Sequence, residues 1–135
     1  MACLEWTQDL SVDVKQIDEQ HRKLVEMLNS LNEAILAKRG REAQKAAIDA
    51  MVDYTVSHFG LEEKYMKAFG YEGFDAHKAE HDNFTKKAVD LKERVSRAGF
   101  VLTLEIVEFL KQWLQGHIRG TDRGYRECFQ AHGLH

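Results

Sequence analysis

The sequence contains no proline, only two cysteines and no apolar run long enough to cross a membrane. A chain without proline, and rich in leucine, alanine, glutamate and lysine, has little to interrupt long helices. Cys3 and Cys128 lie near opposite ends without a CxxC spacing, which argues against a disulfide framework. We therefore expect two reduced thiols in a helical protein that folds around an apolar core.

The chain also lacks a strong excess of positive or of negative charge. The formal net charge is only -3 in 135 residues, and acidic and basic side chains are mixed along the chain. No basic stripe suggests a nucleic-acid partner, and the first ten residues, MACLEWTQDL, resemble no secretory signal. A single domain over residues 1–135, located in the cytoplasm, is the expectation from length and composition.

Four long segments carry apolar or inward-facing residues at alternating spacings of three and four, which is the pattern of an amphipathic helix. The inward positions are His21, Leu24, Leu28, Leu31 and Ile35; Ile48, Met51, Thr55, His58, Glu62, Tyr65 and Phe69; Phe74, His77, His81, Phe84, Ala88, Leu91 and Val95; Ile106, Leu110, Trp113 and His117.

The breaks between these segments set the predicted helices at about 19–38, 42–69, 74–98 and 102–118, with a short helix at about 122–130. Gly40, Gly70 and Gly99 are placed like helix C-terminal glycines, and Asp18 like an N-cap. Short connections favour antiparallel neighbours. The sequence thus predicts an all-α, up-down-up-down four-helix bundle with a non-helical N-terminal arm, residues 1–17.

The polar residues on the inward stripes are the unusual feature of this sequence. A buried polar group without a partner costs about 1–3 kcal/mol, so six of them in one core need a shared partner, which a metal cluster provides. His58 and Glu62, like the pair His77 and His81, are spaced i,i+4 and therefore share one helix face. Imidazoles and carboxylates together suit iron, and their number exceeds what one tetrahedral zinc needs.

Asp122 is a further candidate ligand, but it follows His117 by five residues. On a regular α-helix this spacing turns it about 140° away from His117. We therefore predict that the fourth helix breaks or forms a π-like turn between the two residues, helped by the glycines at 116, 120 and 124.

His21 and the motifs HFGLE, HKAEH and HIRGTD, with the flanking text IDEQHRKLVEMLN, HFGLEEKYM and WLQGHIRGTDRGY, resemble the hemerythrin family, and within it the bacterial single-domain members. The resemblance extends from about Trp6 to Phe129. One departure is Glu72, where many relatives carry proline; it affects no candidate ligand.

The resemblance implies a non-haem pair of iron ions. One ion would be held by His77, His81 and His117, and the other by His21 and His58 with one position left open for O2. Glu62, Asp122 and an oxo or hydroxo group would bridge the two ions. By the same resemblance, the O2 pocket would be apolar and would contain Leu24, Phe59, Trp113, Leu114, Ile118 and Tyr125.

The function implied is reversible O2 binding for transport, storage or delivery to an oxygen-consuming enzyme, by a monomeric carrier that is not itself an enzyme. The absence of any E-x-x-H motif agrees, because carboxylate-rich di-iron enzymes use two of them. Three alternatives remain. The domain would be an O2 or redox sensor acting through a partner, or a di-iron enzyme that handles peroxide or nitric oxide or detoxifies iron. Alternatively, His77 to His81 would be an H-x-x-E-H zinc-protease motif with Glu80 as base.

Overall fold

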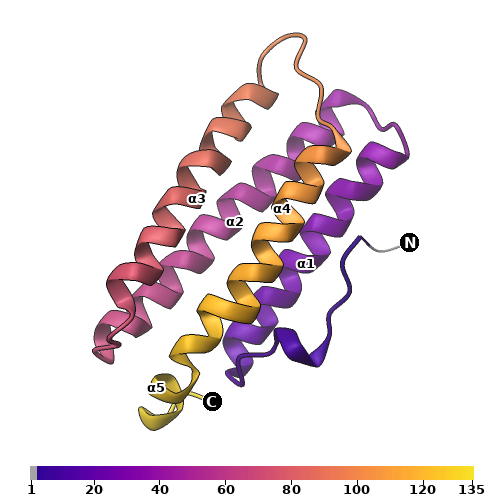
Figure 1. Ribbon diagram of the computed structural model, residues 1–135. Coiled ribbons are helices and arrows are strands. Elements are labelled where there is room, and N and C mark those ends of the chain that lie inside the picture. The colour runs from indigo at the N-terminus through magenta and orange to yellow at the C-terminus, as the bar shows by residue number, and fades with distance from the viewer. Residues whose placement is uncertain (1–2) are drawn as a thin grey trace.

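Four antiparallel helices form a bundle in the computed structural model, which describes residues 3–135. Figure 1 shows the N-terminal arm lying along the bundle and the C-terminal helix at one end of it. The bundle helices are α1 (Lys15–Leu36), α2 (Arg41–Ala68), α3 (Phe74–Val95) and α4 (Leu104–Gly116). The shorter elements are η1 (Gln8–Leu10), η2 (His117–Thr121), η3 (Asp122–Tyr125) and α5 (Arg126–Ala131).

The first helix begins earlier than the sequence predicted, at Lys15, and Asp18 is not its N-cap. The Asp18 carboxylate instead accepts hydrogen bonds from the Ser11 hydroxyl at 2.5 Å and from the Val12 amide at 2.8 Å. These contacts fasten the arm to the first turn of α1. Since Val12 and Val14 are fully buried, the arm forms part of the core.

Two of the three expected helix-ending glycines adopt the left-handed conformation, Gly70 with φ of 64° and Gly99 with φ of 82°. Gly40 does not: its φ is -56°, and it immediately precedes α2. Lys38 takes the left-handed conformation there instead, with φ of 52°. α3 also ends at Val95, before the predicted limit of 98, because the chain turns away ahead of Gly99.

The core follows the predicted stripes on the first three helices more closely than on α4. On α4 the buried residues are Val107, Leu110 and Leu114, whereas Ile106 and Trp113 are only half-buried. Adjacent apolar residues offer two stripes one position apart, and spacing alone does not choose between them.

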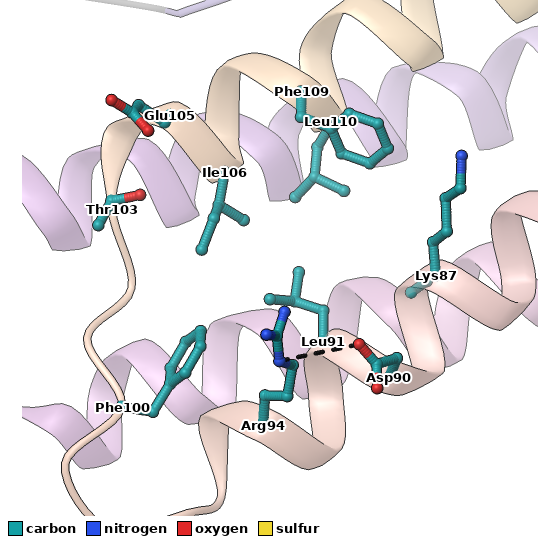
Figure 2. A pocket seen from close by; sticks show the side chains of 11 residues that line it. Lys87, Asp90, Leu91, Arg94, Phe100, Thr103, Glu105, Ile106, Phe109 and Leu110 are labelled. Carbon is teal, nitrogen blue, oxygen red and sulfur yellow. Dashed lines mark ion pairs between the residues drawn. The ribbon is translucent and has the colours of Figure 1, made fainter.

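α3 and α4 enclose a groove at the end of the bundle away from α5 (Figure 2). Leu91, Phe100 and Ile106 point into it, and an ion pair between Arg94 and Asp90 lies along one wall. In the part of the chain that the structure describes, no helix is both long and apolar enough for a membrane span.

Candidate metal centre

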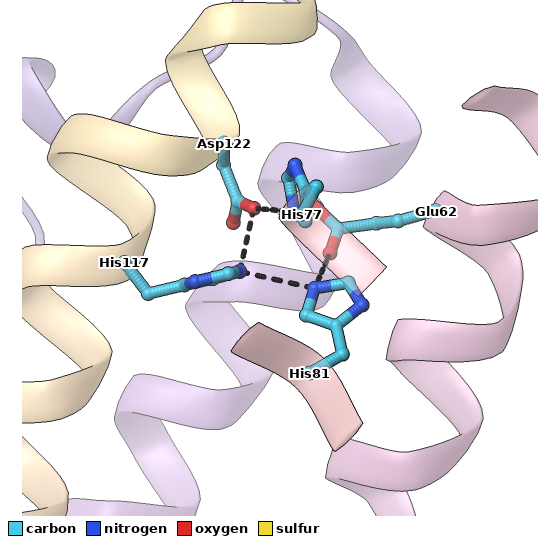
Figure 3. A group of neighbouring side chains, drawn as sticks. All are labelled: Glu62, His77, His81, His117 and Asp122. Atoms are coloured by element: carbon cyan, nitrogen blue, oxygen red, sulfur yellow. Dashed lines mark hydrogen bonds and ion pairs between the residues drawn. The ribbon is translucent and has the colours of Figure 1, made fainter. Parts of the chain in front are cut away.

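Seven polar side chains meet inside the bundle near the α5 end, and none exposes more than 4% of its surface. Figure 3 shows five of them pointing toward one another. They come from α1 (His21), α2 (His58, Glu62), α3 (His77, His81), η2 (His117) and η3 (Asp122). The structure therefore brings together every metal ligand proposed from the sequence.

The seven side chains form two overlapping groups, in each of which the ligand atoms lie within 4.8 Å of one another. One group is Glu62, His77, His81, His117 and Asp122; the other is His21, His58, Glu62 and Asp122. Both groups share Glu62 and Asp122, and each of these carboxylates has two oxygens. The arrangement could hold two metal ions with two carboxylates between them.

Distances between the ligand atoms fit metal coordination. Two ligands at right angles on an ion, with bonds of about 2.1 Å, place their donor atoms about 3.0 Å apart. The Nε2 atoms of His81 and His117 are 3.0 Å apart. Asp122 Oδ1 lies 2.9 Å from Nε2 of His77 and of His117, and Asp122 Oδ2 lies 3.1 Å from His21 Nε2.

Unsatisfied polar atoms support the same conclusion. Eight buried atoms of this cluster have no hydrogen-bond partner among the described residues, including His21 Nε2, His58 Nε2, His77 Nε2 and both Asp122 oxygens. Leaving such atoms unpaired is costly, whereas coordination to metal satisfies them together. The residues present therefore fit a pair of ions of the kind that bind imidazole and carboxylate.

The π-like turn that the sequence predicted is confirmed. α4 ends at Gly116, and His117–Thr121 form a π-helix that turns Asp122 back toward His117. The backbone geometry does not, however, require glycine at two of the three positions. Gly116 has a helical φ of -63°, and a Cβ added at Gly116 or Gly120 would meet no atom within 4 Å. A Cβ added at Gly124 would lie 2.6 Å from the Tyr71 hydroxyl oxygen, so the end of the Tyr71 side chain would have to shift.

Aromatic rings cover the histidines. Phe59 stacks on His81 with ring centroids 3.8 Å apart, and the half-buried Trp113 stacks on His117 at 4.4 Å. Tyr125 is fully buried, and its hydroxyl donates a hydrogen bond of 2.5 Å to Glu62. The remaining residues expected in the apolar pocket are buried in the bundle core: Leu24, Leu114 and Ile118.

Opposite charges dominate the electrostatics of the cluster. Burial raises the pKa of the Glu62 carboxyl, but the surrounding imidazoles, first of all that of His58, hold it well below its usual range. Burial lowers the pKa of His21, but the carboxylates of Asp122 and Glu62, which lie 3.1 and 3.6 Å from its Nε2, raise it to about 9. Without metal, His21 therefore keeps a proton at neutral pH and partly takes the place of a cation.

This protonation predicts how the stability of the metal-free protein depends on pH. The folded pKa of His21, about 9, lies above its unfolded value of 6.5, so the stabilisation is complete below pH 6.5 and is lost as pH rises through 9. We expect the free energy of unfolding to fall by about 3 kcal/mol over this interval. Urea unfolding of chelator-treated protein at several pH values measures it. His21→Gln should flatten the slope, and an equally steep slope in that variant would contradict the assignment.

Sequence reasoning did not predict which side chain contacts the outer nitrogen of each histidine. Gln20, Glu63 and Glu80 accept hydrogen bonds at the Nδ1 atoms of His58, His81 and His117. They lie on the flanks of the helices, where hydrophobic periodicity gives no signal. Each one is, however, the direct sequence neighbour of a candidate ligand, and that adjacency could have singled them out.

Comparison with known proteins agrees with the geometry of the cluster. Residues 12–128 match the family model of the hemerythrin HHE cation binding domain. The chain is 41% identical to a bacteriohemerythrin of Stenotrophomonas maltophilia, over 98% of this chain and 85% of that protein. It is 33% identical to a bacteriohemerythrin of Methylococcus capsulatus, over 97% of this chain and all of that one.

The fold has solved relatives as well. A crystal structure of wild-type hemerythrin superposes with a TM-score of 0.89 at 33% identity, covering 94% of this chain and 98% of that one. The antiparallel bundle, the buried cluster of histidines and carboxylates and these matches over nearly the whole chain lead to one conclusion: the chain belongs to the hemerythrin family.

Proposed function

We propose that the chain binds O2 reversibly at a pair of iron ions and acts as an oxygen carrier or store rather than as an enzyme. The observation that carries this proposal is the sharing of Glu62 and Asp122 by two groups of histidines, three in one group and two in the other. In the smaller group fewer side chains surround the metal position, which leaves room there for a small ligand. When bound, a ferrous pair supplies the two electrons needed to hold O2.

The residues of the chain would divide the remaining work. His77, His81 and His117 would hold one ion, His21 and His58 the other, and Glu62 and Asp122 would bridge them. The Tyr125 hydroxyl orients Glu62 through its hydrogen bond.

Water exclusion would fall to the apolar side chains of the pocket. Leu24, Phe59, Leu114 and Ile118 expose at most 5% of their surface and form the dry wall around the cluster. Dry walls keep away the water and protons that would convert bound O2 into released peroxide.

The carrier proposal includes delivery of O2 to an oxygen-consuming enzyme.

The position of Glu80 argues against the alternative that HKAEH is a zinc-protease motif. Glu80 accepts hydrogen bonds from His117 Nδ1 and from the Thr121 hydroxyl, on the side of the imidazole away from the shared carboxylates. A general base would have to face the metal-bound water instead.

Optical titration tests the proposed function. Iron-loaded protein is reduced without oxygen, exposed to air and then purged with inert gas, while its spectrum is followed. A coloured oxygenated form that returns to the colourless reduced form supports a carrier. Irreversible oxidation, or steady O2 consumption with added reductant, would overturn the carrier assignment in favour of a redox sensor or an enzyme.

Leu114→Ala provides a test of the dry wall. Leu114 is 5% exposed, and truncation would open a path for water beside the cluster. We expect the oxygenated form to decay several-fold faster than in the original protein. Leu31→Ala is the matched control, because Leu31 is a fully buried leucine on α1 ten residues beyond His21. Equal decay rates in the two variants would assign the effect to general loosening of the core.

A further inference from the structure

Three of the five clustered histidines are held from outside by a side chain of the preceding helix. His58 Nδ1 on α2 is 2.6 Å from Oε1 of Gln20 on α1. His81 Nδ1 on α3 is 2.9 Å from Oε2 of Glu63 on α2. His117 Nδ1, at the end of α4, is 3.2 Å from Oε1 of Glu80 on α3. These cross-helix contacts continue in one direction around the bundle.

Helix geometry explains why the three acceptors can contact histidines on the next helix. Gln20, Glu63 and Glu80 each adjoin a clustered residue, so each lies about 100° around its helix from a side chain that points inward. That direction faces the neighbouring helix. Because oxygen acceptors fix the proton on Nδ1, the Nε2 lone pair of each imidazole is left free toward the centre of the bundle.

The contacts differ in charge between the two halves of the cluster. Both carboxylates, Glu63 and Glu80, support histidines of the three-histidine group. The two-histidine group has the neutral amide of Gln20. A carboxylate on the outer N–H makes an imidazole a more basic ligand than an amide oxygen does, and its negative charge favours a cation nearby.

We propose that Glu63 and Glu80 are positioning residues that make the two metal positions unequal, so that the three-histidine position takes up a metal ion first and holds it more tightly. This inference rests on the two-metal site of the proposed function. The third histidine by itself would also make that position bind a metal ion more tightly. The effect of the charge on Glu63 and Glu80 therefore needs its own test.

The two carboxylates should differ in how strongly they affect metal binding. The Glu63 side chain is 21% exposed, and its contact with His81 is the shorter one. The Glu80 side chain is 47% exposed and is shared with the Thr121 hydroxyl, so solvent screens more of its charge. Glu63→Gln should therefore weaken metal binding more than Glu80→Gln.

Zinc binding to the metal-free protein, followed by the ring 15N signals of the histidines, separates the two positions. Zn²⁺ alone is the probe, since it is diamagnetic and needs no oxygen chemistry. In the original protein, the first equivalent should shift His77, His81 and His117, and the second His21 and His58. Glu63→Gln should weaken only the first step, by about 10- to 100-fold, the usual range for lost outer partners of metal-bound histidine.

Gln20→Glu supplies the opposite change. It places a carboxylate behind His58 and should tighten only the second step. Asp90→Asn is the matched control: Asp90 lies on α3 like His81, but its side chain is 62% exposed and pairs with Arg94. This variant should bind zinc like the original protein.

Unequal effects on the two steps are the signature that a purely structural role would not produce. If Glu63→Gln weakened both steps equally, or left both unchanged, the inference would be overturned. If Glu63→Ala weakened the first step but Glu63→Gln did not, the contact would depend on shape rather than on charge. That outcome would also overturn the inference. Failure of reversible O2 binding alongside the predicted zinc pattern would refute only the proposed function.

Discussion

Asp122→Ala should reduce the iron content from two ions per chain to one or none. Both Asp122 oxygens face histidine nitrogens: Oδ1 lies 2.9 Å from Nε2 of His77 and of His117, and Oδ2 lies 3.1 Å from Nε2 of His21. In the proposed two-iron site, removing this carboxylate would affect both metal positions at once and would take away one of the two bridges. Metal analysis after iron loading and desalting measures the effect, and O2 binding should be lost with the iron.

The control for this variant is Asp82→Ala, which removes an exposed carboxylate close to the cluster in sequence and should retain two ions per chain. Misfolding is separable from ligand loss, because circular dichroism of the metal-free proteins reports the helices directly. A folded Asp122→Ala protein that still carried two ions and bound O2 would remove Asp122 from the site.

Removing iron from the unaltered protein should lower its thermal stability strongly. Eight buried polar atoms of the cluster lack hydrogen-bond partners among the described residues, and a metal ion that binds only the folded chain would satisfy them. At a free metal concentration about 1,000 times the dissociation constant, the stabilisation is about 4 kcal/mol. For a domain of this size, that corresponds to a fall in Tm of roughly 15 °C on chelation.

Calorimetry with and without chelator measures this difference, and restoring ferrous iron under anaerobic conditions should recover it. Asp122→Ala serves again as the comparison, since its Tm should respond little to iron. An unchanged Tm in the original protein after verified iron removal would mean that the folded chain gains nothing from the metal.

The sequence by itself determined the architecture and the identity of the candidate ligands. Alternating spacings of three and four placed four helices, because the periodicity of one helix is a local property of the chain. The same spacings put His58 with Glu62 and His77 with His81 on shared faces. For Asp122 to join His117, the offset of five predicted a break or a π-like turn between them, and the structure contains a π-helix there.

Some local details depended on the packed chain. Asp18 does not cap α1, because its carboxylate accepts a hydrogen bond from the Val12 amide and so holds the N-terminal arm against the helix. Of the neighbours Trp113 and Leu114, Leu114 is the one buried in the core, on a helix that packs against α1. Adjacent apolar residues cannot encode that choice by spacing alone.

Only the tertiary structure decided which side chains meet across helices. Glu62 and Asp122 lie between the two histidine groups, and Glu63 and Glu80 reach histidines of the next helix, because the helices are set at particular heights and rotations. Those heights and rotations depend on side-chain packing along the whole bundle. No single helix carries that information, so its own periodicity could indicate a ligand but not the neighbour that ligand meets.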